Sequence, residues 1–242
     1  MVKRVQSLTP AKDFRLFITS EINPKLPTGL VRISDKIISE AQTGVKATLS
    51  RFFMNISSER LTHPEKNRLY LMVGWTHAII QERLRFVPTG WTERYGFTES
   101  DALHALDSID ALLNERSGGK LPIAPEDIPW ESLRMTLSKS IFGGRISNPI
   151  DQKNLDYFLD KLFVPSSFDV DFKLVEGDAT DLPILPEDSS KDGCIKWISD
   201  LPTYNPPTWI GLDSTAEERK SKETGKKIIE KISFILKSEV NE

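Results

Sequence analysis

The sequence predicts a mainly α-helical protein, and three observations support that fold class. Between residues 43 and 163, apolar side chains recur at the three- and four-residue spacing of amphipathic helices. Every proline between 60 and 165 falls at or near a boundary of these periodic segments, as expected for a residue that interrupts helices. Alternation typical of strands is confined to short stretches before residue 43 and after residue 165. The expected product is a helical bundle with a small β fragment and an irregular C-terminal segment.

The longest predicted helix, over 64–87, is the centre of this arrangement. Thr62 and Glu65 form a capping-box pattern before it, and Pro88 and Gly90 end it. Its apolar residues cover more than one stripe, so the helix is expected to be buried on several sides. They are Leu69, Tyr70, Leu71, Met72, Val73, Trp75, Ala78, Ile79, Ile80, Leu84 and Val87.

Two strands are predicted before the bundle. Residues 13–20 carry apolar side chains on both faces, which is typical of a strand buried within a sheet, and 31–40 is the second candidate. Two strands do not form a stable sheet alone. Either they pair with something outside this sequence, or they belong to a truncated α/β domain.

Four further helices are predicted around the central one. Each presents one apolar face, and the last three begin at a capping residue or a proline. They cover 43–54, 98–115, the stretch from Pro129 to the glycines at 143 and 144, and the stretch from Asn148 to Pro165.

After Pro165 the pattern changes. Residues 168–175 alternate as a strand does, and the proline-rich stretch 176–213 is expected to be mostly extended, with Trp197 and Trp209 anchoring it to the bundle. A final amphipathic helix is predicted over 222–237. Its apolar stripe predicts docking on the body of the protein, and the alternative is a solvated helix that fits an absent partner. The stripe consists of Ile228, Ile229, Ile232, Ile235 and Leu236.

Composition excludes several classes of protein. A formal net charge of −3 offers no general attraction to nucleic acid or to an anionic membrane. No apolar run approaches the roughly 18 residues of a membrane-spanning helix, and the N-terminus lacks the apolar core of a secretory signal. The single cysteine, Cys194, rules out an internal disulfide framework and is expected to be an ordinary free thiol in a reducing compartment.

Three short patterns could carry chemistry, and each has a simpler explanation. SGGKL at 117–121 lacks both the first glycine and the hydroxyl residue of a phosphate loop, and a helix precedes it. GGR at 143–145 is expected to be a turn between helices. Asp169 and Asp171 share one face of a predicted strand, where solvated carboxylates are commoner than an acid–base pair.

The histidines also predict no site. His77 and Glu82 lack the spacing that places two zinc ligands on one helix face, and His104 lies on the polar side of its helix. His63 precedes the central helix without a partner in the sequence. The residues themselves therefore predict no catalytic, cofactor-binding or metal-binding group.

Long segments of the chain nevertheless resemble a known family, the dynein heavy chains, in their C-terminal part. The similarity runs in order from about residue 10 to residue 240. The segments that carry it are FRLFITSEINPKLP (14–27), RLYLMVGWTHAIIQERLRFVPTGW (68–91), IPWESL (128–133), IFGGRISNPIDQKNLDYFLDKLF (141–163) and PTWIGL (207–212).

This resemblance implies a domain organisation. Residues 1–42 resemble the end of the large part of the sixth AAA+ module, including its sensor strand, with Asn23 near the sensor position. Residues 43–163 resemble the helical lid of that module, and 164–242 resemble the start of the C-terminal region. The expected fold is thus an AAA+ lid-type helical bundle attached to a β fragment of a truncated α/β domain.

The resemblance also implies a role. The family forms a ring of six AAA+ modules that converts ATP hydrolysis into movement along microtubules, and its sixth module is taken to be structural. We therefore expect a non-catalytic ring component that binds neither ATP nor magnesium itself, in a cytoplasmic, cytoskeletal motor. Expected partners are the other modules of the same heavy chain, dynein accessory chains and, through a homodimeric parent, the microtubule. The alternative is a helical binding module for accessory or regulatory proteins.

Overall fold

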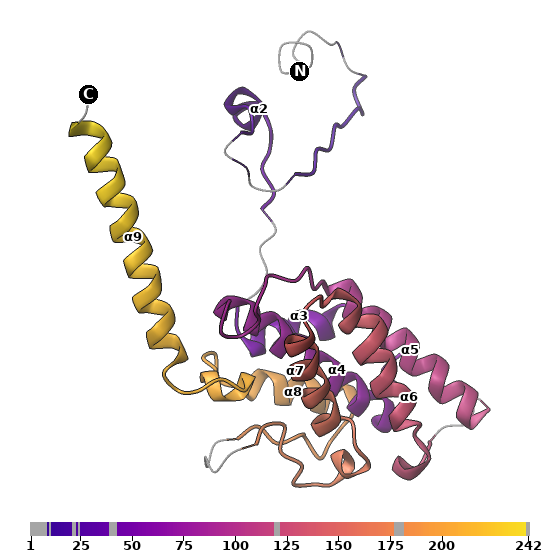
Figure 1. Ribbon diagram of the computed structural model, residues 1–242. Helices are drawn as coiled ribbons and strands as arrows, with labels where there is room; N and C mark the ends of the chain where they lie inside the picture. Colours follow the sequence, from indigo (N-terminus) through magenta and orange to yellow (C-terminus); the bar gives the residue numbers. More distant parts are fainter. Residues whose placement is uncertain are drawn as a thin grey trace. The chain divides into compact units, whose positions relative to one another are not determined.

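The computed structural model describes residues 9, 11–20, 23, 25–38, 43–118, 122–176 and 182–240 (Figure 1). The chain divides into two units, Met1–Ala41 and Gln42–Glu242, and each is described by itself. The α-helices are α2 (Thr28–Ile33), α3 (Val45–Met54), α4 (Pro64–Arg83), α5 (Glu99–Ser117), α6 (Trp130–Met135), α7 (Pro149–Leu162), α8 (Lys191–Asp200) and α9 (Ala216–Val240). Shorter elements are the 3-10 turns η1 (Leu84–Phe86), η2 (Pro125–Asp127), η4 (Gly143–Arg145), η5 (Pro165–Phe168) and η6 (Pro207–Ile210), and the π-helix η3 (Thr136–Ile141).

The first unit contradicts both predicted N-terminal strands within its described residues. Residues 14–20 form no ladder, and α2 occupies the start of the second candidate; positions 39 and 40 of that candidate lie outside the described residues. Phe17 is 85% exposed, and no described side chain before residue 39 is buried. A strand requires a partner for its backbone groups, and the described part of this unit supplies none.

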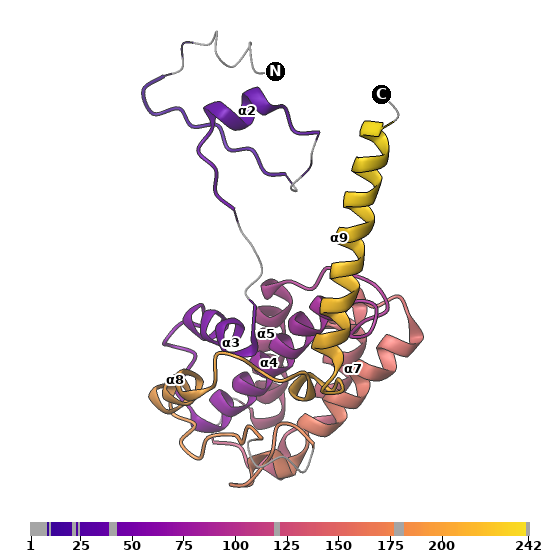
Figure 2. The same ribbon diagram turned by 90° about the vertical axis from the view of Figure 1, so that its left-hand side faces the viewer.

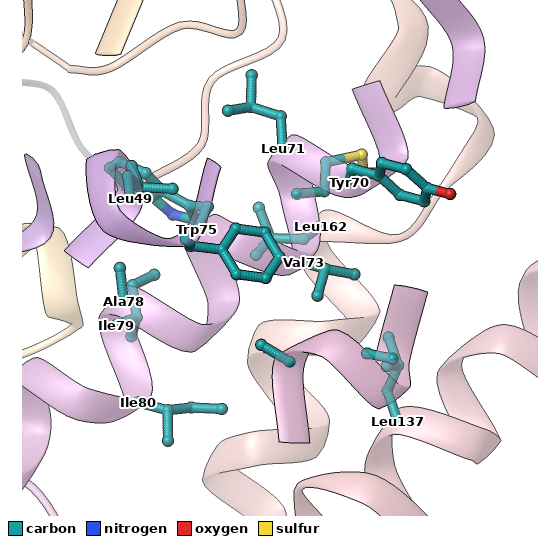
Figure 3. Packing of buried hydrophobic residues seen from close by; sticks show 14 of the residues in the cluster. Leu49, Tyr70, Leu71, Val73, Trp75, Ala78, Ile79, Ile80, Leu137 and Leu162 are labelled. Carbon is teal, nitrogen blue, oxygen red and sulfur yellow. The ribbon is translucent and has the colours of Figure 1, made fainter. Parts of the chain in front are cut away.

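The central helix is confirmed. Every residue of α4 from Asn67 to Ile80 is buried, which matches the prediction of a helix covered on several sides. Figure 3 shows its side chains pointing in several directions, toward Leu49 of α3, Leu137 of η3 and Leu162 of α7. The predicted residues Leu84 and Val87 follow α4, in the 3-10 turn η1 and just after it.

Helices α3, α5 and α7 pack on α4, in agreement with the predicted bundle (Figure 2). Gly74 permits the close packing of α3 on α4, because a Cβ atom there would lie 2.7 Å from the Phe52 ring of α3. The capping box predicted before α5 is present: the Thr98 amide donates to the Asp101 carboxylate at 2.8 Å. The helix predicted from Pro129 begins as α6 and then widens into η3, a π-helix that sequence periodicity does not reveal.

The region after Pro165 differs from its prediction in two ways. The strand predicted over 168–175 is reduced to one antiparallel bridge between Lys173 and Ile184, because only the short stretch around residues 183–185 lies alongside it. The stretch 176–213 also contains α8, whose N-cap Ser190 accepts a hydrogen bond from the Gly193 amide at 3.1 Å. The serine cap and the apolar spacing after it are the signals that the abundant prolines obscured.

Both predicted tryptophan anchors are confirmed. The ring centroids of Trp197 and Trp209 lie 6.3 Å and 5.8 Å from that of Trp75 in α4. Trp209 is buried and Trp197 is half-buried. The C-terminal region is therefore fastened to the central helix by a cluster of three indoles.

The predicted docking of the final helix is wrong. Helix α9 is longer than predicted, and no described side chain between Ser221 and Phe234 is buried; Ile228 and Ile232 are 52% and 51% exposed. Ser221 and the glycine at 225 occupy the helix face that continues the stripe toward the body. The apolar face is therefore interrupted before it reaches the bundle. Within the described residues, no helix is long and apolar enough to cross a membrane.

Candidate functional site at the end of the central helix

The C-terminal end of α4 carries a buried carboxylate that joins two parts of the chain. Glu82 is 2% exposed, and its Oε2 accepts a hydrogen bond of 2.8 Å from the backbone amide of Gly44. Its Oε1 forms an ion pair with Arg85, one helical turn later. A carboxylate this deeply buried requires such partners, because an unpaired one is strongly destabilising.

Gly44 marks the point where the chain enters the bundle. Its φ of 94° lies in a region that side chains rarely adopt, and it directly precedes α3. The next amide, on Val45, donates at 3.1 Å to Oδ1 of Asn205 in the C-terminal region. The first free amides of α3 are thus satisfied by two distant segments, α4 and the stretch before η6.

The same end of α4 also holds the beginning of α9. Arg85 lies 3.6 Å from a carboxylate oxygen of Glu217, and the Lys220 ammonium lies 4.9 Å from the centre of the Phe86 ring. Burial lowers the pKa of Lys220, and the positive charge of Arg85 lowers it further. We call the set Gly44, Glu82, Arg85, Asn205 and Glu217 the junction.

A second buried charge lies beside the junction. Arg83 is 4% exposed, and its guanidinium carbon lies 5.1 Å from the ring centres of both Trp91 and Phe158. It donates to the backbone carbonyl of Ile210 at 2.5 Å, and burial lowers its pKa to about 10. Arg83 therefore fixes η6, and with it the C-terminal region, against α4 and α7.

Near its other end, α4 holds the C-terminal region with another buried arginine. The Arg68 guanidinium donates to the carbonyls of Ser167 and Pro186 at 2.7 Å and of Asp169 at 3.0 Å. Burial lowers its pKa. Both arginines bind backbone carbonyls, so their role is to hold loops in place.

The junction joins several segments of the second unit at one end of the central helix. One helix end binds the entry of the bundle through Glu82 and the start of α9 through Arg85. A displacement of either segment changes the surroundings of the same carboxylate–guanidinium pair. The polar groups of the junction are hydrogen-bonded or ion-paired with one another.

The short patterns considered in the sequence lie outside the junction. The turn predicted at GGR is η4. Gly118 caps α5 in the left-handed conformation with φ of 61°, while the rest of SGGKL, 119–121, lies outside the described residues. Asp169 and Asp171 lie at the end of η5 and in the turn after it, so the expectation that they share one face of a strand is wrong.

The histidines and the cysteine also lie outside the junction. His77 is buried between the rings of Phe52 and Phe142, each 6.4 Å away, whereas His104 is exposed on α5 and His63 is the N-cap of α4. Cys194 is a free thiol, as predicted; it is fully buried, and burial raises its pKa to about 12. Asn23 lies in the first unit, where its Oδ1 accepts a hydrogen bond from the Lys25 amide. Among the described residues, no group of three potential ligands is arranged to hold a metal ion.

Comparison with known proteins decides the family. A family model described as the dynein heavy chain AAA lid domain matches residues 66–216, more than half of the chain. The chain belongs to the dynein heavy chain family. Curated relatives include cytoplasmic dynein heavy chains from Caenorhabditis elegans (42% identity over 89% of this chain), Drosophila melanogaster (41% over 89%) and Dictyostelium discoideum (41% over 98%). The chain covers 5% of the length of each of these relatives.

The dynein lid match contains most of the junction. Glu82, Arg85 and Asn205 fall inside residues 66–216, while Gly44 lies before them and Glu217 follows directly. Sequence reasoning missed this site because it tested Glu82 only as a metal ligand. The spacing of Glu82 and Arg85, three residues apart where the predicted helix ends, was the available signal.

Proposed function

We propose that this chain is a non-catalytic, structural part of a dynein motor ring, where it helps to close the ring and to transmit conformational change. The family match to an AAA lid domain supports the location in the ring. The observation that carries the transmitting role is the junction, in which one end of α4 binds both the entry of the bundle and the start of α9.

The parent protein supplies the chemistry in this proposal. An ATP-driven microtubule motor hydrolyses ATP with magnesium in other AAA+ modules, and this chain contributes neither a phosphate loop nor an acidic metal motif. Its first partners are the neighbouring modules of the same heavy chain. Contact with accessory chains, homodimerisation and microtubule binding belong to the parent, which we place in the cytoplasm on the cytoskeleton in line with the names of its relatives.

The exposed apolar face of α9 supports contact with another part of the motor. Ile228, Ile229 and Ile232 are each more than half exposed on a helix whose first turns are held by the junction. A contiguous row of exposed apolar side chains is typical of a surface on which another protein element packs. This observation also agrees with the alternative, a helical binding module for accessory proteins.

The experiment is a neutral substitution of the buried carboxylate within a complete dynein heavy chain. Glu82→Gln keeps the size of the side chain but weakens its bonds to the Gly44 amide and to Arg85. We expect basal ATPase activity to persist and microtubule gliding velocity to fall by about twofold or more, since residues that couple distant sites contribute about 0.5–2 kcal/mol.

Glu131→Gln is the matched control, because Glu131 is exposed on α6 and lies outside the junction. The control should glide at the parental velocity. Equal velocities for the two variants, with Glu82→Gln correctly folded, would contradict the transmitting role. A loss of velocity accompanied by an equal loss of basal ATPase would instead indicate general damage to the motor.

A further inference from the structure

The C-terminal region contains a groove that none of the junction residues lines. It encloses about 550 Å³ between the loop at 182–183, the end of α8 and the segment before η6. Its lining is mostly apolar and includes two leucines. The remaining lining residues are Trp197, Trp209, Pro183, Pro202, Pro206 and Asp200.

The two indoles of the groove are held in fixed positions. The Nε1 atom of Trp197 donates to the carbonyl of Ile184 at 2.8 Å, and both rings pack against Trp75 of the central helix. Trp209 is 6% exposed. A rigid aromatic wall loses little conformational freedom when a ligand packs on it, which favours binding.

Asp200 is the titratable residue in this lining, and its side chain is exposed. Among the described residues it forms no ion pair; the nearby Lys46 ammonium instead donates to the carbonyl of Ser199 at 2.6 Å. One carboxylate at an aromatic groove complements a ligand that is apolar along most of its length and carries a cation.

We propose that this groove binds an extended segment of another protein that contains prolines and an arginine. Proline-rich segments adopt the polyproline II conformation before binding, and their rings pack on the aromatic walls of such grooves. A guanidinium pairs with a carboxylate through two hydrogen bonds and also stacks on indoles, so arginine fits Asp200 and the half-buried Trp197 better than lysine does. The same chain already stacks Arg83 on Trp91.

The test uses the whole chain and a defined probe. The probe is a blocked ten-residue polyproline peptide with one added arginine at its amino end, titrated by calorimetry. We expect saturable one-to-one binding, and we expect Asp200→Asn to weaken it about two- to fivefold, as for an exposed ion pair. Asp192→Asn, an exposed carboxylate on the same helix outside the groove, is the matched control and should bind as the parent does.

A second probe separates charge from apolar packing. The same peptide with glutamate in place of arginine should bind the parent more weakly than the arginine peptide does. The two peptides should bind Asp200→Asn with equal affinity. The proposal is overturned if the arginine peptide fails to bind at millimolar concentration. It is also overturned if the two aspartate variants weaken binding equally, or if the glutamate peptide binds the parent as well as the arginine peptide does.

Discussion

Helices α4 and α9 are the two longest helices in the described part of the chain, and they have opposite surroundings. All fourteen residues from Asn67 to Ile80 of α4 are buried, whereas no described side chain from Ser221 to Phe234 of α9 is buried. Both helices contain rows of large apolar residues. The difference is that apolar groups cover α4 on all sides, while α9 has a narrow stripe flanked by lysines. How far around the helix the apolar side chains extend, and not the length of the helix, decides whether the helix is buried in the core.

The polar residues of the two helices differ in the same way. On α4, Arg68 and Glu82 are buried and bonded to backbone groups of distant segments. On α9, ion pairs join neighbouring turns, from Lys222 to Glu218 and from Lys227 to Glu223. Such pairs each contribute roughly 0.2–0.5 kcal/mol to a solvated helix. Polar groups therefore organise the fold around α4, whereas on α9 Glu217 and Lys220 contact the end of α4, and the ion pairs of the following turns stabilise the helix itself.

The largest expected effect tests the buried helix. Trp75 is fully buried against Trp197 and Trp209, and Trp75→Ala leaves a cavity among these rings. We expect a loss of about 3–5 kcal/mol in the free energy of unfolding, measured by urea denaturation. Ile229→Ala on α9 is the control, because Ile229 is 65% exposed and its truncation should cost less than about 0.5 kcal/mol. A melting temperature for Trp75→Ala within a degree or two of the parent would remove the contrast between the helices.

The second prediction concerns how stability depends on pH, because the buried helix α4 contains a histidine. His77 of α4 is buried, and burial lowers its pKa to about 4, an effect that Glu99 and Asp101 oppose. The unfolded chain binds this proton near pH 6.5, so protonation favours unfolding. Protonation of His77 therefore does not reduce the free energy of unfolding above pH 6.5. As the pH falls toward 4, it reduces the free energy of unfolding by roughly 3 kcal/mol at most.

Urea denaturation at pH 7, 5 and 4 measures this loss. His77→Gln has no titrating imidazole, so its stability should fall less steeply over the same range. His104→Gln, at an exposed position on α5, should follow the parent. The buried-histidine explanation fails if His77→Gln and the parent have the same pH dependence.

The bundle was predictable because local and tertiary signals agree there. The capping residues Thr98 and Asn148 start α5 and α7 where expected, and the all-round apolar pattern of α4 predicted its burial. The strand at 13–20 was not correctly predicted, because alternation shows only that a segment suits a sheet. Whether a sheet forms depends on partner strands, and the described part of the first unit contains none.

The junction was beyond prediction for a related reason. Glu82 binds Gly44, 38 residues earlier, and Asn205 binds Val45, 160 residues earlier. Contacts between residues so far apart in the sequence produce no periodic pattern from which they could be predicted. The groove is similar, since α8 was hidden in a proline-rich stretch, although both of its tryptophans were correctly expected to contact the bundle.

The smallest expected effect tests the exposed helix. Ile232→Asp places a charge on the apolar stripe of α9, where the native side chain is already 51% exposed. Since water reaches this position, the substitution should change the unfolding free energy of the bundle by less than about 0.5 kcal/mol. Limited proteolysis should cleave between Asp213 and Gly225 at the parental rate. The matched variant is Leu106→Asp on α5, which buries an unpaired carboxylate at a fully buried position and should unfold the bundle. If Ile232→Asp instead lowers stability by more than about 1 kcal/mol, or opens the segment before α9 to protease, the stripe is covered in solution. The two helices would then differ in degree of burial, and the sequence-based expectation of a docked α9 would be restored.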